Sequence, residues 1–362
     1  MTNTAQCSKE DYPQTLACVR LLLQNNTEWK DRYTNYIAKL NDNALMRFKI
    51  AVKHFNVPAP FHLYMSMSTA VNECSSVKTI FELRFHGQSA AIIKVDNNQD
   101  KSVYIAVKAP QSIIKALNAA KMTEEAERLA KYHSICYKDN NIIDWLDWHG
   151  EEARDLRKIY LDLESIFSSS PKVKETLGYP EHDMECELLK NYSQKSSTDK
   201  EILNIQPVMM GETNARFQMP APIKASEAKK GINFIKYSGQ YGGGIDILAR
   251  VGSGKGTKLA VLELKDSYTK NEPAEKVMHQ AVAYAAFLRE LLRSECGEKW
   301  WRFFGFGGNI PKKLEIKAIV VMPDYPNADT SFGGVELPIG NDVLKLGYIY
   351  RADDPANQKI CI

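Results

Sequence analysis

The sequence predicts an α/β protein of the α+β type, with a mixed sheet flanked by helices in its C-terminal half. Between residues 181 and 322 the hydrophobic pattern follows the order helix, several strands, helix, strand. The chain has 362 residues, 44% of them hydrophobic and 25% charged, which is typical of globular proteins and enough for two domains. The serine-rich stretch SSSPK, at residues 168–172, is the expected boundary between them.

The first half, residues 1–168, is predicted to be a separate, helix-rich α+β domain. Helical periodicity covers residues 12–25 and 28–55, and β-type patterns cover 78–95 and 102–108. Helical patterns return at residues 111–137 and 141–167. The sequence shows no helix-turn-helix or zinc finger, so recognition, regulation and dimerisation all stay open as roles for this half.

The second half, residues 169–362, carries the pattern of the mixed sheet. A short helix is expected at residues 181–192. Strands are expected at 216–219, 232–237, 245–251 and 259–265, followed by a long helix at 273–293 and a strand at 314–322. Because a helix separates the last two strands, the sheet is expected to contain parallel as well as antiparallel neighbours.

The composition argues against several classes of function. Basic and acidic residues are nearly balanced in both halves, and the net charge of the whole chain is only +3. A nucleic-acid contact would therefore depend on local placement of Lys and Arg. The seven cysteines form no C-x-x-C pair, which argues against a disulfide framework and a structural zinc site. The sequence shows neither a run of roughly 20 apolar residues nor a signal-peptide pattern at its start. We therefore expect a cytoplasmic protein without a membrane partner.

The stretch GSGKGT, residues 252–257, resembles a phosphate-binding loop but does not fit its spacing. That motif requires Ser or Thr directly after Gly-Lys and a glycine five positions before its second Gly. Here Gly256 follows Gly254-Lys255, and Ala249 stands five positions before Gly254. A strand pattern follows at residues 259–265, where the motif needs a helix. The stretch is therefore predicted to be a hairpin turn whose glycines adopt positive φ, and an NTPase is not favoured.

This turn predicts which charged side chains meet. A hairpin centred between Gly254 and Lys255 places Asp246 directly opposite Glu263, and opposed residues have Cβ atoms about 4.5–5.5 Å apart. Lys265 is two residues beyond Glu263 and shares its strand face. Two carboxylates this close repel each other unless a positive group lies between them, and a divalent cation would meet that need.

The strand that carries Glu263 looks buried on both faces. Ala260, Leu262 and Leu264 form one face, while Leu259 and Val261 accompany Glu263 on the other. A buried carboxylate without a partner costs several kcal/mol in practice, which favours a functional role. The alternative is structural, with Lys265 forming an ion pair with Glu263 or Asp246.

At these residues the sequence resembles the PD-(D/E)xK nucleases, the restriction-endonuclease-like superfamily. The family pattern places an Asp at the start of one strand and Glu-x-Lys on the next, matched here by Asp246, Glu263 and Lys265. Many members add Gln-x-x-x-Tyr on the following helix, matched by Gln280 and Tyr284. The resemblance covers roughly residues 180–323 and does not explain the first 165.

Two parts of the resemblance are less specific. Ile245 stands where many members have the Pro that precedes the Asp. Family members often carry another acidic residue on the first core helix, and a helical projection of residues 181–192 directs Glu185 toward the apolar stripe, with Glu181 close by. An ordinary surface glutamate is the alternative for Glu185, and packing at the core edge is the alternative for Gln280 and Tyr284.

The resemblance implies metal-assisted hydrolysis of phosphodiester bonds. Mg²⁺, with Mn²⁺ as a substitute, would be held by Asp246, Glu263 and the backbone carbonyl of Leu264, because hard cations prefer oxygen ligands. Lys265 would orient or activate the attacking water and stabilise the charge that develops on the phosphate. Gln280 would help to position the lysine, the water or the phosphate, and Glu185 is the fifth candidate for catalysis.

The implied function is a metal-dependent nuclease that acts on DNA, with RNA as the alternative substrate, in restriction, repair or anti-phage defence. A homodimer would let two such sites cut two strands. The competing interpretation is a non-catalytic nucleic-acid- or protein-binding module that retains the nuclease fold. Endonucleolytic and exonucleolytic attack, and single- and double-stranded substrates, are not distinguished by the sequence.

Overall fold

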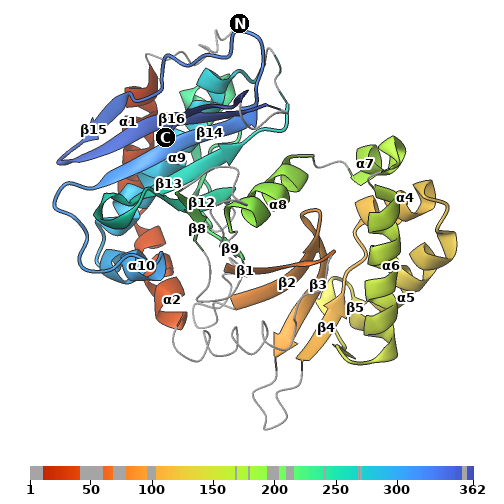
Figure 1. Ribbon diagram of the computed structural model, residues 1–362. Helices are drawn as coiled ribbons and strands as arrows, with labels where there is room; N and C mark the ends of the chain where they lie inside the picture. Colours follow the sequence, from red (N-terminus) through yellow and green to blue (C-terminus); the bar gives the residue numbers. More distant parts are fainter. Residues whose placement is uncertain are drawn as a thin grey trace, which may run out of the picture.

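Two β-sheets organise the protein, and helix α8 (Pro180–Tyr192) lies between them in the computed structural model (Figure 1). Helices α4–α7 accompany the first sheet, and α1, α2, α9 and α10 accompany the second (Figure 1). The structure describes residues 11–40, 60–67, 79–95, 103–167, 169–177, 180–193, 204–208, 216–239, 242–267, 269, 271–352 and 357–362.

The first sheet has six strands in the order β7-β4-β3-β2-β1-β9. All its neighbours are antiparallel except β1 and β9, which are parallel. Its strands are β1 (His62–Met67), β2 (Thr79–Phe85), β3 (Gln88–Val95), β4 (Val103–Val107), β7 (Leu146–Asp147) and β9 (Arg216–Gln218). The accompanying helices are α4 (Gln111–Ala119), α5 (Thr123–Cys136), α6 (Glu151–Phe167) and α7 (Pro171–Leu177).

The second sheet is mixed, as the sequence predicted. Its main path runs β15-β16-β14-β13-β12-β8, and a seventh strand, β17, pairs with β16. Strands β13, β14 and β16 are mutually parallel, and the other pairs are antiparallel. The strands are β8 (Ile205–Pro207), β12 (Ile247–Val251), β13 (Lys258–Leu264), β14 (Glu315–Pro323), β15 (Glu336–Ile339), β16 (Asp342–Arg351) and β17 (Lys359–Cys361).

Both faces of β13 are buried, as its composition predicted. Leu259 and Val261 belong to the core that includes α9 (Ala274–Leu292). Ala260, Leu262 and Leu264 belong to the smaller core that α8 completes through side chains such as Leu188. Helices therefore flank this sheet on both sides, which agrees with the predicted α+β class.

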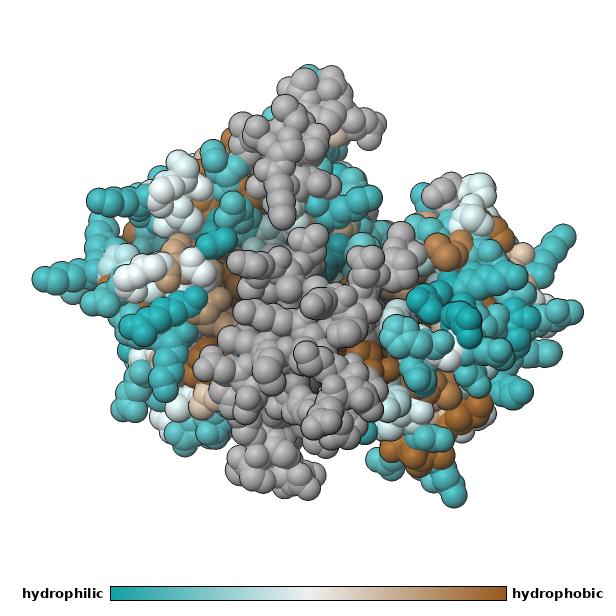
Figure 2. All heavy atoms as spheres, turned by 60° about the horizontal axis from the view of Figure 1, so that its bottom comes forward, coloured by the Kyte–Doolittle hydropathy of each residue, from teal (hydrophilic) through white to brown (hydrophobic). Residues whose placement is uncertain are grey.

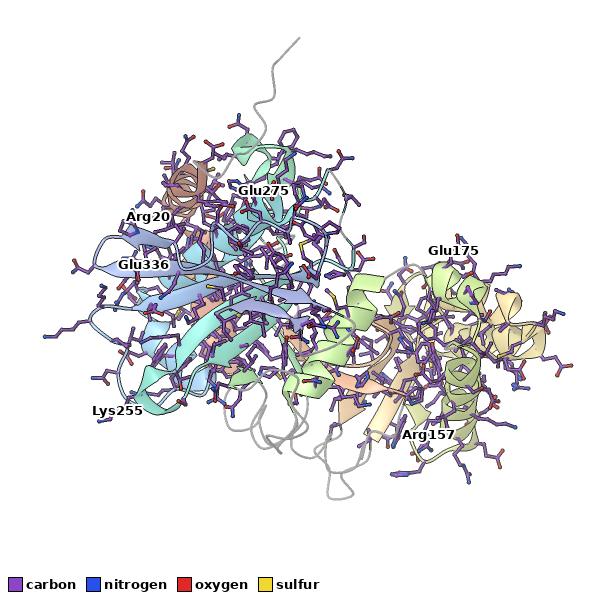
Figure 3. The ribbon with its side chains drawn as sticks, turned by 45° about the horizontal axis from the view of Figure 1, so that its top comes forward. Arg20, Arg157, Glu175, Lys255, Glu275 and Glu336 are labelled. Carbon is purple, nitrogen blue, oxygen red and sulfur yellow. The ribbon has the colours of Figure 1, made fainter. Side chains whose placement is uncertain are left out.

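The N-terminal helices pack against the second sheet's long helix rather than the first sheet. Helix α1 (Tyr12–Asn25) contacts α9, and α2 (Glu28–Lys39) brings Trp29 and Tyr33 against Phe287 of α9. Figure 3 shows Arg20 of α1 and Glu275 of α9 on the same side of the protein. In the opposite direction, β9 of the second half joins the first sheet. The boundary at residue 168 stays a prediction, but the contacts cross it at both places.

Several local predictions are confirmed and others are wrong. The helix expected at residues 12–25 matches α1, and the one expected at 273–293 differs from α9 by one residue at each end. The helix expected at 111–137 is interrupted near Lys121, whose φ is +63°. The helix expected from residue 141 begins only at Glu151, because positive φ at Asp139 and Asn140 turns the chain back into a short antiparallel pair.

Two further differences concern short or partly described segments. The strand expected at residues 232–237 is a 3₁₀ helix, Ile232–Phe234, followed by the two-residue strand β11 (Lys236–Tyr237). Helix α2 ends at Lys39, and residues 41–55 of the helix predicted at 28–55 lie outside the described residues.

Within the described part of the chain, the helices fall short of the combined length and apolarity needed to span a bilayer. The described side chains on the face drawn in Figure 2 are mostly hydrophilic, with scattered hydrophobic areas.

Candidate active site

The hairpin between β12 and β13 has the predicted register. Ile247 pairs with Leu262 and Val251 pairs with Lys258, so the next step along the ladder places Asp246 opposite Glu263. Gly252 and Gly254 in the turn have φ of +107° and +52°, which side chains with a Cβ rarely adopt. A strand follows the glycines, and the phosphate-loop interpretation is therefore excluded. Lys255 marks the outer tip of this hairpin in Figure 3.

Asp246 is held at the end of β12 by backbone contacts on both sides. Its Oδ2 accepts a hydrogen bond from the backbone N–H of Leu264 at 2.9 Å. The preceding glycines permit a close approach of the chain: a Cβ on Gly242 would lie 1.8 Å from the carbonyl oxygen of Ala221, and one on Gly243 would lie 2.1 Å from the Tyr284 hydroxyl. The close packing of these glycines therefore determines the position of Asp246.

Glu263 is almost completely buried, with 1% exposure, and faces α9. Gln280 donates a hydrogen bond from Nε2 to Glu263 Oε1. The other oxygen, Oε2, is buried and accepts no hydrogen bond from the described residues. It shares a hydrogen bond with Asp246 only when one of the two carboxyl groups is protonated, because two carboxylates are both acceptors. The charge of Lys265 acts on an ionised Glu263, but no donor reaches Oε2 within the described residues.

The electrostatics of the two carboxyl groups reflect this arrangement. Burial raises the pKa of Asp246 to about 6, against the lowering effect of the Leu264 N–H and with a further raising contribution from Glu185. Burial, and then the charge of Asp246, raise the pKa of Glu263 well above its usual range. Ionising both groups is costly without a cation, which is the behaviour expected of a pair that shares one ligand.

Lys265 extends from the end of β13 toward α8. Its Nζ lies 2.5 Å from Oε1 of Glu181, and its side chain is 13% exposed. Burial lowers the pKa of Lys265, but the carboxylates of Glu263 and Glu181 outweigh burial and raise it above its ordinary value. The amine therefore stays protonated beside the carboxylate pair.

Glu185 lies near this site but hydrogen bonds away from it. It is 6% exposed, and it accepts a hydrogen bond from the Tyr64 hydroxyl at 3.3 Å. His182 Nδ1 lies 3.4 Å from its other oxygen. Arg216 donates to the Tyr64 hydroxyl at 2.9 Å, so the first sheet helps to hold Glu185. The charge of Glu185 raises the pKa of Asp246, but no hydrogen bond joins the two side chains within the described residues.

The structure thus brings together Asp246, Glu263, Lys265 and Gln280, and places Glu185 at the edge of that group. Glu181, which the helical projection places close to Glu185, is not among the residues that the sequence pattern predicts for the site. The spacing of four residues puts both glutamates on one face of α8, and only the position of α8 against β13 decides which one meets Lys265.

The donor set suits a hard divalent cation in part. Asp246 and Glu263 supply carboxylate oxygens. The Leu264 carbonyl points toward the same edge of β13 as its N–H, which meets Asp246, because both groups of a strand residue point to one side. A cation near Glu263 Oε2 would also provide the direct contact that this buried oxygen lacks. In the described ranges, no group of three His, Cys, Asp or Glu side chains could hold a metal ion. The Leu264 carbonyl is the third protein donor that the sequence pattern implies.

Comparisons of this chain with protein-family models, with curated proteins and with solved structures found no match.

Proposed function

We propose that this protein is a divalent-metal-dependent nuclease that hydrolyses phosphodiester bonds, with its active site at the ends of β12 and β13. The observation that carries the proposal is the pair Asp246 and Glu263, which converge at a point where Glu263 Oε2 is buried without a donor. Lys265, whose protonated amine lies beside this pair, would stabilise the negative charge that develops on the phosphate during the reaction.

The described elements support a restriction-endonuclease-like fold for residues 180–323 as part of the same proposal. Helix α8, the strands β8, β12 and β13, helix α9 and strand β14 occur in this order, with β9, β10 and β11 between β8 and β12 and α10 between α9 and β14. Asp246 directly precedes one strand and Glu263 is on the next, which matches the sequence pattern of that superfamily. Gln280 and Tyr284 lie on the following helix, where many members have Gln-x-x-x-Tyr. The substrate proposed is DNA, cut by a homodimer in the cytoplasm during restriction, repair or anti-phage defence.

Each side chain has a distinct task in the proposed reaction. Asp246, Glu263 and the Leu264 carbonyl would hold the cation, which supplies Lewis-acid activation of the phosphate and of a water molecule. Lys265 remains protonated, stabilises the negative charge that grows on the phosphate and orients the attacking water. Gln280 keeps Glu263 in position through Oε1, which leaves Oε2 directed at the site.

A non-catalytic nucleic-acid- or protein-binding module is the second candidate, and one observation favours it. Lys265 already has an ion pair with Glu181, so its charge is satisfied without a phosphate. In an enzyme this contact would orient the amine, whose other two N–H donors can meet the water and the phosphate. In a binding module it would be a permanent structural link between α8 and β13.

A nuclease screen separates the two candidates. Linear, circular and single-stranded DNA and RNA are incubated with the purified protein in Mg²⁺ or Mn²⁺, beside Glu263→Ala and the matched control Glu187→Ala. Glu187 is on the same helix as Glu181 but is 63% exposed and pairs with Arg351. We expect cleavage by the wild type and the control and a loss of at least 100-fold in Glu263→Ala. No cleavage of any substrate by the wild type would contradict the proposal.

Metal binding is tested separately by calorimetric titration with Mg²⁺ and Mn²⁺. The wild type should bind, whereas Asp246→Asn should bind at least tenfold more weakly because one of two carboxylate ligands is lost. Binding without cleavage would favour the non-catalytic module.

A further inference from the structure

A lysine-rich hairpin adjoins the glycine run that leads to Asp246. It consists of β10 (Ile223–Lys224), β11 (Lys236–Tyr237) and the two 3₁₀ turns between them, and it is called the lysine hairpin below. Residues 222–238 contain four lysines and one glutamate, although the whole chain has a net charge of only +3. This short segment therefore concentrates positive charge in a protein that is otherwise nearly neutral.

Two of these lysines face each other without a direct ion pair to an acidic side chain. Lys224 and Lys236 are directly opposite in the antiparallel pair, and both are exposed. Opposed residues have Cβ atoms about 4.5–5.5 Å apart, and like charges at such positions destabilise a sheet. Lys229 pairs with Glu272 and Lys230 pairs with Glu227, whereas no direct ion pair of Lys224 or Lys236 occurs within the part of the chain that the structure describes. The charge of Lys224 acts on Glu227 only at longer range, and Glu227 already pairs with Lys230.

The fold does not need this charge pair. The other face of the hairpin provides its packing, since Ile223 has no exposure and belongs to the main core. Two exposed positions on a ladder of only two residue pairs would be more stable with almost any uncharged or oppositely charged pair. The repulsion would be relieved by an anion bound across both ammonium groups.

Backbone hydrogen bonds connect the lysine hairpin firmly to the active site. Gly243 N–H donates to the carbonyl of Ile223 at 2.7 Å, and Ala221 N–H donates to the carbonyl of Gly243 at 2.8 Å. Ala225 N–H donates to the Tyr284 hydroxyl, one helical turn from Gln280. Lys224 is thus flanked by two residues whose backbones contact the groups that position Asp246 and Gln280.

We propose that Lys224 and Lys236 bind the phosphate backbone of the nucleic acid next to the phosphate that is cleaved. The inference rests on the proposed nuclease function, because it assigns the neighbouring part of the same substrate to this surface. A polyanion matches the observations: it supplies successive phosphates to two adjacent ammonium groups and needs no base-specific contact. The contact would fix the register of the strand relative to Glu263 and Lys265.

The test measures binding in EDTA, where a metal-dependent nuclease does not turn over. Fluorescence anisotropy of a labelled 20-base-pair DNA duplex is followed from about 50 to 200 mM salt for the wild type and for Lys224→Ala/Lys236→Ala. The control is Lys312→Ala/Lys313→Ala, two exposed lysines that precede β14 at the end of the sheet opposite Glu263. Each phosphate contact contributes about 0.9 to the slope of log affinity against log salt concentration.

We expect the Lys224→Ala/Lys236→Ala slope to decrease by about 2 and its Kd to rise roughly tenfold or more at 100 mM salt, with the control unchanged. A second variant, Lys236→Glu, separates binding from folding. It converts the repulsive pair into an attractive one, so it should raise the thermal midpoint while it weakens DNA binding. A purely structural role for Lys236 would not produce these opposite effects.

The outcomes for the two proposals are distinguishable. Cleavage by the wild type, together with an unchanged salt slope in Lys224→Ala/Lys236→Ala, would overturn the lysine hairpin proposal and leave the nuclease intact. Lysine-dependent binding without any cleavage would support the hairpin as a nucleic-acid surface and reject the nuclease. A wild type that neither binds nor cleaves would overturn both.

Discussion

Replacing Asp246 by Asn should stabilise the metal-free protein at neutral and alkaline pH. Burial raises the pKa of Asp246 to about 6 from 3.8, so ionising it in the folded state costs at most about 3 kcal/mol. Asparagine avoids this cost, and its Oδ1 can still accept the hydrogen bond from Leu264 N–H. Its amide can also donate to Glu263 Oε2, which has no donor among the described residues. We expect a gain of roughly 1–3 kcal/mol in the free energy of unfolding at pH 8.

The pH dependence of this difference follows from the direction of the pKa change. A carboxyl group with a raised pKa binds its proton more tightly in the folded state, so the wild type loses stability as pH rises from about 4 to about 6. Below pH 4 the two proteins should therefore have similar stability, and by pH 7 the contribution of Asp246 itself should be complete. Because the charge of Asp246 also raises the pKa of Glu263, the difference should not decrease at higher pH. Urea denaturation in EDTA at pH 4, 6 and 8 measures the effect.

Adding 10 mM Mg²⁺ at pH 8 extends the same experiment. The cation should stabilise the wild type, because it binds only where the two carboxylates are assembled, and should have little effect on Asp246→Asn. Equal or lower stability of Asp246→Asn at pH 8 in EDTA would refute the reasoning. It would mean that Lys265 already compensates the charge of Asp246, and the carboxyl pair would then be an ordinary structural ion-pair cluster.

Three further substitutions test other parts of the structure. Glu181→Gln should lower kcat about 10- to 100-fold because it removes the ion pair that orients the Lys265 amine, while Glu187→Gln should have no effect. Equal rates of the two variants in a nuclease assay would show that the ion pair between Lys265 and Glu181 has no role in the reaction. Gly243→Ala should cost roughly 2–3 kcal/mol in urea denaturation because its Cβ would overlap the hydroxyl of the tyrosine on α9, whereas Gly256→Ala, which has open space, should be neutral. Burial lowers the pKa of His86, but hydrogen bonds to its two carboxylate partners, Asp183 and Glu164, outweigh burial and raise the pKa to about 9. His86→Gln should therefore lower the free energy of unfolding by roughly 1–2 kcal/mol below pH 6.5, after allowance for the exposure of the partners. This difference should vanish as pH rises to 9. A difference between wild type and His86→Gln that persists at pH 9.5 would contradict this sign.

The sequence predicted the central features of the candidate site because they depend on local geometry. The length of the glycine turn fixes the register of the β12–β13 hairpin, and that register puts Asp246 across from Glu263. The alternation of side chains along β13 then decides which residues share the face of Glu263. Helical spacing likewise predicted that Gln280 and Tyr284 lie on one side of α9, where Gln280 meets Glu263.

Errors occurred where local patterns are ambiguous or where the pairing is remote. Residues 141–150 resemble a helix in composition, but the left-handed backbone at Asp139 and Asn140 reverses the chain before them. Strands β1 and β9 are more than 140 residues apart in the chain and pair in parallel. No local signal specifies such a partner, because the free energy that selects it comes from the packing of the whole sheet.

By itself the sequence determined the α+β character, the hairpin register and the convergence of two acidic side chains at the end of two strands. Each of these follows from spacings of a few residues, which backbone geometry converts directly into position. Only the tertiary structure decided that α8 brings Glu181 rather than Glu185 to Lys265, that α1 packs on α9, and that Lys224 faces Lys236 beside the glycine run. Those contacts join segments far apart in the chain, and their selection depends on burial and charge balance over the assembled fold.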